Sequence, residues 1–140
     1  MDEAGYEYFD VEADVGIRAW GPTRARAFAK AAEAVFGLLV SVEDVEVRES
    51  REARAQGDSP EGLLVNWINE CLYVHEIEGF VARRVEMTAL DDRFAHGVLH
   101  GEEIAPARHR LGTIVKAATA HGVVVAVHDD RHEVRLIVDV

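Results

Sequence analysis

Hydrophobic and polar positions alternate with a helical period in two parts of the chain. Apolar residues recur at helical spacing over residues 23–39, and again from residue 59 to just before Gly79. Thr23 opens the first segment and Ser59 the second, and both residue types are favoured at the start of a helix because their hydroxyl oxygen accepts a backbone hydrogen bond. The pattern therefore predicts two amphipathic helices.

Most of the remaining chain is rich in β-branched and aromatic residues, broken by short polar turns. The predicted strands are residues 15–20, about 45–55, 80–90, 93–103, 113–119, 122–128 and 134–138. Short turns between the later strands favour antiparallel pairing. We expect a single domain, residues 1–140, of the α+β class: a two-layer sandwich in which a mostly antiparallel or mixed sheet carries both amphipathic helices on one face.

Composition narrows the choice of partners. The chain is 49% hydrophobic, which is enough for a core, and its formal net charge is -11. A chain with this excess of negative charge is repelled by the phosphate backbone of nucleic acids. We therefore expect no direct nucleic-acid binding and favour a basic partner or a bound cation. No basic segment followed by an apolar one opens the sequence, and no apolar run approaches ~20 residues. We therefore expect a cytoplasmic protein that does not enter a membrane.

The single cysteine and two closely spaced histidines are residue types that can act in catalysis or bind metals, but their sequence context favours structural roles. Cys71 falls within the apolar pattern of the second predicted helix, where a buried, inert thiol is expected. His96 and His100 are four residues apart, a spacing that binds zinc on a helix, but Gly97 and Gly101 favour a strand. No nucleophile elbow, Walker loop or dinucleotide-binding pattern occurs, and we expect no catalytic residues.

Three carboxylates alternate near the N-terminus, within FDVEADVGIRAWG. They are Asp10, Glu12 and Asp14. If this stretch is extended, alternate side chains share one face. Oxygen-rich clusters of this kind suit calcium, which takes several carboxylate or carbonyl ligands. The stretch by itself is also consistent with a solvated acidic strand edge, which is the commoner arrangement.

Six longer stretches carry a resemblance to a known family. They are YEYFDVEADVGIRAWG, AFAKAAEAVFGLLV, VRESRE, LLVNWINECLYVHEIEG, HRLGTIVKAATAHGVVV and the final LIVDV. No single stretch is a catalytic signature. Because all six occur in order and at matching spacing, the chain resembles the archease family over nearly its whole length.

The resemblance implies an accessory role and a metal site. Archeases assist the GTP-dependent RNA-splicing ligase, which joins RNA ends bearing a 2′,3′-cyclic phosphate or a 3′-phosphate to a 5′-hydroxyl, by promoting ligase guanylylation and multiple turnover. The family's calcium-type site falls on Asp14 and Asp139, with Val140 contributing a main-chain or terminal oxygen. Glu12, which stands where the family usually has threonine, is a candidate for an extra ligand in this chain. The implied cofactor is calcium or another divalent cation.

Two further features of the resemblance concern the partner. Most family members have a His-Thr pair where this chain has Val11 and Glu12, which puts in doubt whatever contact that histidine makes. Lys116 and His121 match the family's I-K-A-x-T-x-H pattern and are candidates for contact with the ligase. The residues alone favour structural roles for them, an ion pair for the lysine and a turn cap for the histidine.

Two other functions fit the residues less fully. One is a metal-dependent phosphoester hydrolase in which Asp14 and Asp139 hold the ion and His121 acts as acid or base. The other is a general chaperone or scaffold, which needs no metal.

Overall fold

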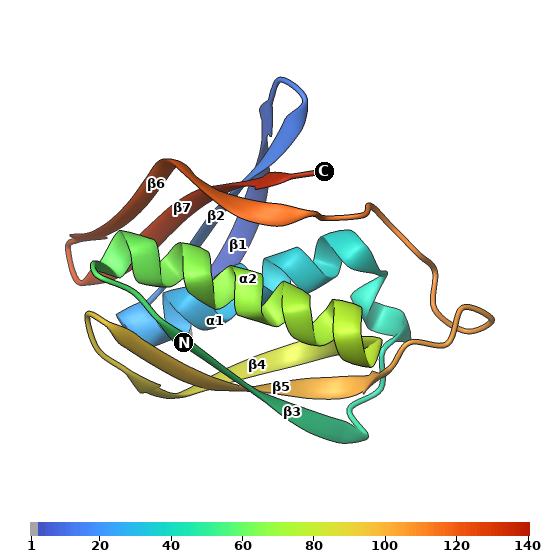
Figure 1. Cartoon of the computed structure of the whole chain (residues 1–140). Coiled ribbons are helices and arrows are strands. Elements are labelled where there is room, and N and C mark those ends of the chain that lie inside the picture. The colour runs from blue at the N-terminus through green and yellow to red at the C-terminus, as the bar shows by residue number, and fades with distance from the viewer. Residues whose placement is uncertain (1–2) are drawn as a thin grey trace.

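The computed structural model describes residues 3–140 and has three layers, a helical layer between two sheets (Figure 1). In chain order the elements are β1 (Gly5–Val11), β2 (Asp14–Gly21), α1 (Arg24–Leu39), the short 3-10 helix η1 (Val42–Asp44), β3 (Glu49–Gln56), α2 (Pro60–Glu78), β4 (Phe80–Leu90), β5 (Phe94–Glu103), β6 (Ala117–His128) and β7 (Arg131–Asp139). Neither α-helix of this described part is long and apolar enough to cross a membrane.

The strands form two antiparallel sheets. One has four strands in the order β1-β2-β7-β6, and the other has three in the order β3-β5-β4. The predicted α+β class, the antiparallel pairing and the two helices are confirmed. The strands divide into two sheets where one was expected, so the helices are covered on both sides (Figure 1).

The composition of α1 explains why a second sheet is needed. Nine of its sixteen residues are buried, and they are distributed around the helix: Ala27, Phe28, Ala29, Ala31, Ala32, Ala34, Val35, Phe36 and Leu39. A helix that is apolar on most sides must be covered on most sides. The alanines among them are small, which lets neighbouring elements approach the helix closely.

The ends of both helices lie where the sequence predicts them. The Thr23 hydroxyl accepts the amide of Arg26 at 3.1 Å, and the Ser59 hydroxyl accepts the amide of Gly62 at 3.0 Å. Helix α2 stops at Gly79, whose φ of 61° lies in the left-handed region that glycine adopts without strain. These caps act locally, so the sequence suffices to locate them.

The core lies in the helical layer and the inward faces of both sheets. Trp67 of α2 is fully buried, and its indole N–H donates to the carbonyl oxygen of Phe28 on α1 at 3.1 Å. This bond ties the two helices together. Cys71 is also fully buried, as predicted, and burial raises the pKa of its thiol.

His96 and His100 both lie on β5, on the same face of the strand. Four residues of extended strand separate them by about 13 Å, which is too far to share one ion. Each is paired instead with a carboxylate. His96 Nε2 lies 2.7 Å from Glu52 Oε1, and His100 Nε2 lies 3.1 Å from a Glu86 oxygen.

Candidate metal and partner site at one end of the four-stranded sheet

Strand pairing brings Asp14 and Asp139 to the same end of the four-stranded sheet. Strands β2 and β7 pair antiparallel, and Val15 opposite Val138 is the last pair of their ladder. The next step of that register puts Asp14 opposite Asp139. Residues that face each other across an antiparallel pair direct their side chains to the same side of the sheet, so the two carboxylates share a face.

Among residues 3–140, neither carboxylate has a cationic partner. Asp14 and Asp139 are both half-buried, and within residues 3–140 neither side chain forms an ion pair or a hydrogen bond. Facing carboxylates repel each other, and a divalent cation between them would remove that repulsion. Since no three Asp, Glu, His or Cys side chains of the described chain converge into a metal group, main-chain oxygens or water would have to complete the coordination.

The predicted common face for Asp10, Glu12 and Asp14 is wrong. A turn at Glu12 and Ala13 connects β1 to β2, so the stretch is a hairpin and not one extended strand. Asp10 pairs with Val15 and therefore lies on the opposite face from Asp14. Glu12 has a φ of 32° in the exposed turn. This hairpin projects at the same end of the molecule as the C-terminus (Figure 1).

Val11, where the resemblance to archeases leads to the expectation of a histidine, pairs directly with Asp14 across this hairpin. Its side chain therefore lies on the same face as that carboxylate. The departure from the family pattern is thus adjacent to the candidate metal ligands and not elsewhere on the surface.

Of the two partner-contact candidates, only Lys116 lies at the end of the four-stranded sheet that carries Asp14 and Asp139. Its backbone N–H donates to the carbonyl oxygen of Asp139 at 2.8 Å, and its side chain is exposed. β6 begins one residue later, at Ala117, so the strand predicted from residue 113 starts later than expected. His121 lies further along β6, inside the register shift between Thr119 and Val124.

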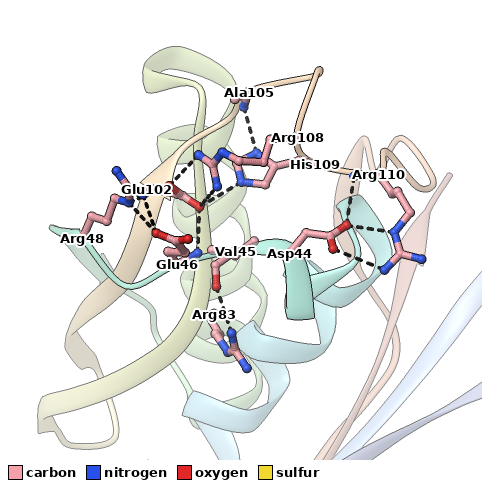
Figure 2. A network of polar contacts seen from close by, with 10 residues as sticks. All are labelled: Asp44, Val45, Glu46, Arg48, Arg83, Glu102, Ala105, Arg108, His109 and Arg110. Atoms are coloured by element: carbon pink, nitrogen blue, oxygen red, sulfur yellow. Dashed lines mark hydrogen bonds and ion pairs between the residues drawn. The ribbon is translucent and has the colours of Figure 1, made fainter.

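A buried ion-pair network, which the sequence did not indicate, anchors the segment that leads to Lys116 (Figure 2). Its centre is Glu102, which is only 3% exposed. The carboxylate accepts two hydrogen bonds from Arg108, at 2.8 and 2.9 Å, and one from the amide of Glu46 at 2.7 Å. These bonds, those of Arg108 above all, hold the pKa of Glu102 far below its usual range.

His109 completes this Glu102 network. It is buried, its Nδ1 accepts the amide N–H of Ala105 at 2.8 Å, and its Nε2 lies 2.9 Å from Glu102. A carboxylate only accepts hydrogen bonds, so Nε2 carries the proton and donates it. The two partners thereby select the neutral tautomer protonated at Nε2.

Residues 110–113 continue from the network in a fixed backbone conformation. The amides of Gly112 and Thr113 donate to the carbonyl oxygens of Leu39 and Leu38, at 2.8 and 2.7 Å. A Cβ at Gly112 would overlap the Leu38 oxygen, so only glycine fits there. Lys116 therefore follows a segment whose backbone is held against the end of α1.

Solved structures of the same class support the fold. The solution structure of Methanobacterium thermoautotrophicum protein 1598 matches with a TM-score of 0.80 and 32% identity, covering 97% of this chain and 99% of that one. A Thermotoga maritima archease, described as a possible chaperone, matches with a TM-score of 0.58 and 16% identity, covering 96% of each chain, and supports the fold alone. This protein therefore has the same two-sheet α+β fold as these structures.

The comparison with protein families is more specific. The model of the Archease protein family (MTH1598/TM1083) matches residues 6–140, and the chain belongs to the archease family. The archease of Pyrococcus abyssi is 33% identical over 139 residues, covering 96% of this chain and 98% of its own. An archease-like protein of Drosophila melanogaster is 33% identical over 145 residues, covering 100% of this chain and 93% of its own. Members of this family are known as accessory proteins.

Proposed function

We propose that this protein is a metal-binding, non-catalytic activator of the GTP-dependent RNA-splicing ligase, which promotes ligase guanylylation and multiple turnover in the cytoplasm. The observation that carries the proposal is the register of β2 and β7, which puts Asp14 and Asp139 in facing positions at the sheet end where Lys116 is exposed. Membership of the archease family supports the choice of the ligase as partner.

In this proposal Asp14 and Asp139 hold calcium or another divalent cation, with a main-chain oxygen of Val140 and water as further ligands. The cation would neutralise the facing carboxylates and join the end of β7 to the β1–β2 hairpin. The same sheet end would then present the exposed ammonium group of Lys116 to an anionic group of the partner.

The charge of the whole chain supports a protein partner with a basic surface. A net charge of -11 would steer the protein toward the cationic, nucleotide-binding face of a ligase. Such steering weakens as salt shortens the Debye length. We therefore expect stimulation of the ligase to decline with ionic strength.

The test uses the ligase from the same source, at well below the RNA concentration, with GTP and a divalent metal. Joined RNA per ligase is counted with and without this protein. We expect many turnovers only in its presence, and a loss of stimulation with Asp14→Ala or Asp139→Ala. Asp58→Ala, which changes an exposed aspartate in the turn before α2, is the matched control. Unchanged stimulation by both site variants would contradict the metal site, and no stimulation by the unaltered protein would contradict the activator role.

The geometry disfavours the hydrolase alternative. A general acid or base must reach the reacting group through a hydrogen bond or one water. His121 lies between Thr119 and Val124, which pair with Ile137 and Arg135, so it is roughly 7 to 13 Å along the sheet from Asp139. The chaperone alternative remains in keeping with the description of the Thermotoga maritima relative. It predicts protection of unrelated proteins from aggregation without any need for a metal.

A further inference from the structure

An apolar groove lies between the C-terminal half of α2 and the segment that leads to β6. Its volume is 760 Å³, within the range of ligand pockets and enough for several apolar side chains. The lining residues that carry the argument are Leu39, Leu72, Glu76, Leu111, Ile114 and Lys116.

Large apolar side chains on the walls of this groove are exposed. Leu111 is 62% exposed and Ile114 is 78% exposed. On the adjoining face of α2, Tyr73 and Ile77 are also exposed and lie one helical turn apart. Apolar side chains gathered in one area of the surface are typical of a place where another molecule binds.

The loop wall of the groove is held in place before any partner arrives. Leu111 forms an isolated bridge with Val40, and the next two amides donate to carbonyl oxygens at the end of α1. At the other end of the segment, the amide of Lys116 donates to Asp139. Leu111 and Ile114 are therefore displayed to solvent by a fixed backbone, which lowers the entropy cost of binding.

The charged groups of the groove indicate what kind of partner fits. Glu76 lies on the helix wall and Lys116 at the end of the loop wall, and Glu76 forms no ion pair with any other residue of the described chain. The chain as a whole carries a net charge of -11. A positively charged residue of the partner would therefore be attracted to this wall and would pair with Glu76.

We infer that this groove binds a short segment of a partner protein in which apolar residues are accompanied by Lys or Arg. The apolar side chains fill the space between Leu72 and Ile114, and the basic residue pairs with Glu76. This binding surface goes beyond the proposed activation of the ligase and does not depend on which protein supplies the segment.

The test selects short random peptides displayed on phage against the immobilised protein, followed by fluorescence anisotropy with the enriched peptides in synthetic, labelled form. We expect enriched peptides that combine apolar and basic residues. Ile114→Ser should weaken their binding about tenfold, since burial of one large aliphatic side chain is lost. Glu76→Gln should weaken binding about threefold and reduce its salt dependence.

Two matched controls should leave binding unchanged. Val127→Ser replaces an exposed apolar residue on β6 that does not line the groove, and Glu70→Gln replaces another exposed carboxylate of α2. Failure to enrich any peptide, enrichment of acidic peptides, or equal affinity for Ile114→Ser and Val127→Ser would each overturn the inference. The assay contains no ligase, so its outcome is separate from that of the turnover experiment.

Discussion

Replacing Glu102 with glutamine is the sharpest test of the buried network, because it removes one charge and leaves the side-chain volume nearly unchanged. Glu102 is 3% exposed and accepts hydrogen bonds from Arg108, His109 and the amide of Glu46. A glutamine oxygen can replace only one carboxylate oxygen. Its NH₂ group would then face the Arg108 guanidinium, so a donor would meet a donor.

The cost follows from the bonds that change. A hydrogen bond to a charged group contributes about 1.5–3 kcal/mol, and breaking a buried pair by removing one partner costs about 3–5 kcal/mol. The Arg108 side chain is 44% exposed and can turn into water, which lowers the penalty. We therefore expect Glu102→Gln to reduce the free energy of unfolding by about 3 kcal/mol and the melting temperature by roughly 10 °C.

The assay is urea unfolding at neutral pH, followed by the fluorescence of Trp20 and the buried Trp67. Glu103→Gln is the matched control, because Glu103 is the neighbouring residue but its side chain is exposed. Its ion pair with Arg51 is long, at 3.9 Å. The control should change the free energy of unfolding by less than about 0.5 kcal/mol. A loss below about 1 kcal/mol for Glu102→Gln, or equal losses for both variants, would refute the reasoning.

The pH dependence gives a second reading of the same variant. The pKa of Glu102 is lowered in the folded protein by its bonds to Arg108, while in the unfolded chain a glutamate titrates near about 4.3. A carboxylate with a depressed folded pKa stabilises the fold above the unfolded value and loses that contribution as the pH falls below it. The stability difference between Glu102→Gln and the unaltered protein should therefore shrink below about pH 4. A difference that stays constant into acid would contradict the assignment.

Three further predictions concern other parts of the molecule. Calcium should raise the melting temperature of the unaltered protein in a thermal scan but not that of Asp14→Ala or Asp139→Ala; equal shifts would argue against the site. Gly112→Ala should reduce the free energy of unfolding by about 2 kcal/mol or more in urea, because its Cβ overlaps the Leu38 carbonyl; a neutral result would mean that the segment moves freely. Thr23→Ala should cost about 1 kcal/mol in the same assay through loss of the helix cap, and Thr23→Ser, which keeps the hydroxyl, should cost less.

The elements that depend on neighbours along the chain were predictable from the sequence. Both helices, their caps at Thr23 and Ser59, and the stop at Gly79 lie where the pattern places them. β4 spans Phe80–Leu90, the range predicted from its residue types. Helical spacing, caps and strand propensity act over a few residues, so they can be read without knowing the fold.

The candidate site was only partly predictable. The resemblance to the archease family pointed to Asp14 and Asp139 as metal ligands. Metal binding by these two residues stays a prediction. Alternation alone placed Asp10 and Asp14 on one face, and the hairpin turn between them makes this wrong. Glu102 gave no signal, because glutamate in a strand is ordinarily exposed. Its burial depends on Arg108 and His109 folding back from the following loop.

By itself, the sequence determined the identity and limits of the helices, the presence of most strands, the excess of acidic residues and the family. Tertiary structure alone decided that the strands divide between two sheets, that β2 and β7 pair with Asp14 facing Asp139, and that a charged network lies beneath the segment leading to Lys116. The physical reason is the range of the interactions involved. Local patterns fix the elements, whereas register and burial depend on which distant segments meet.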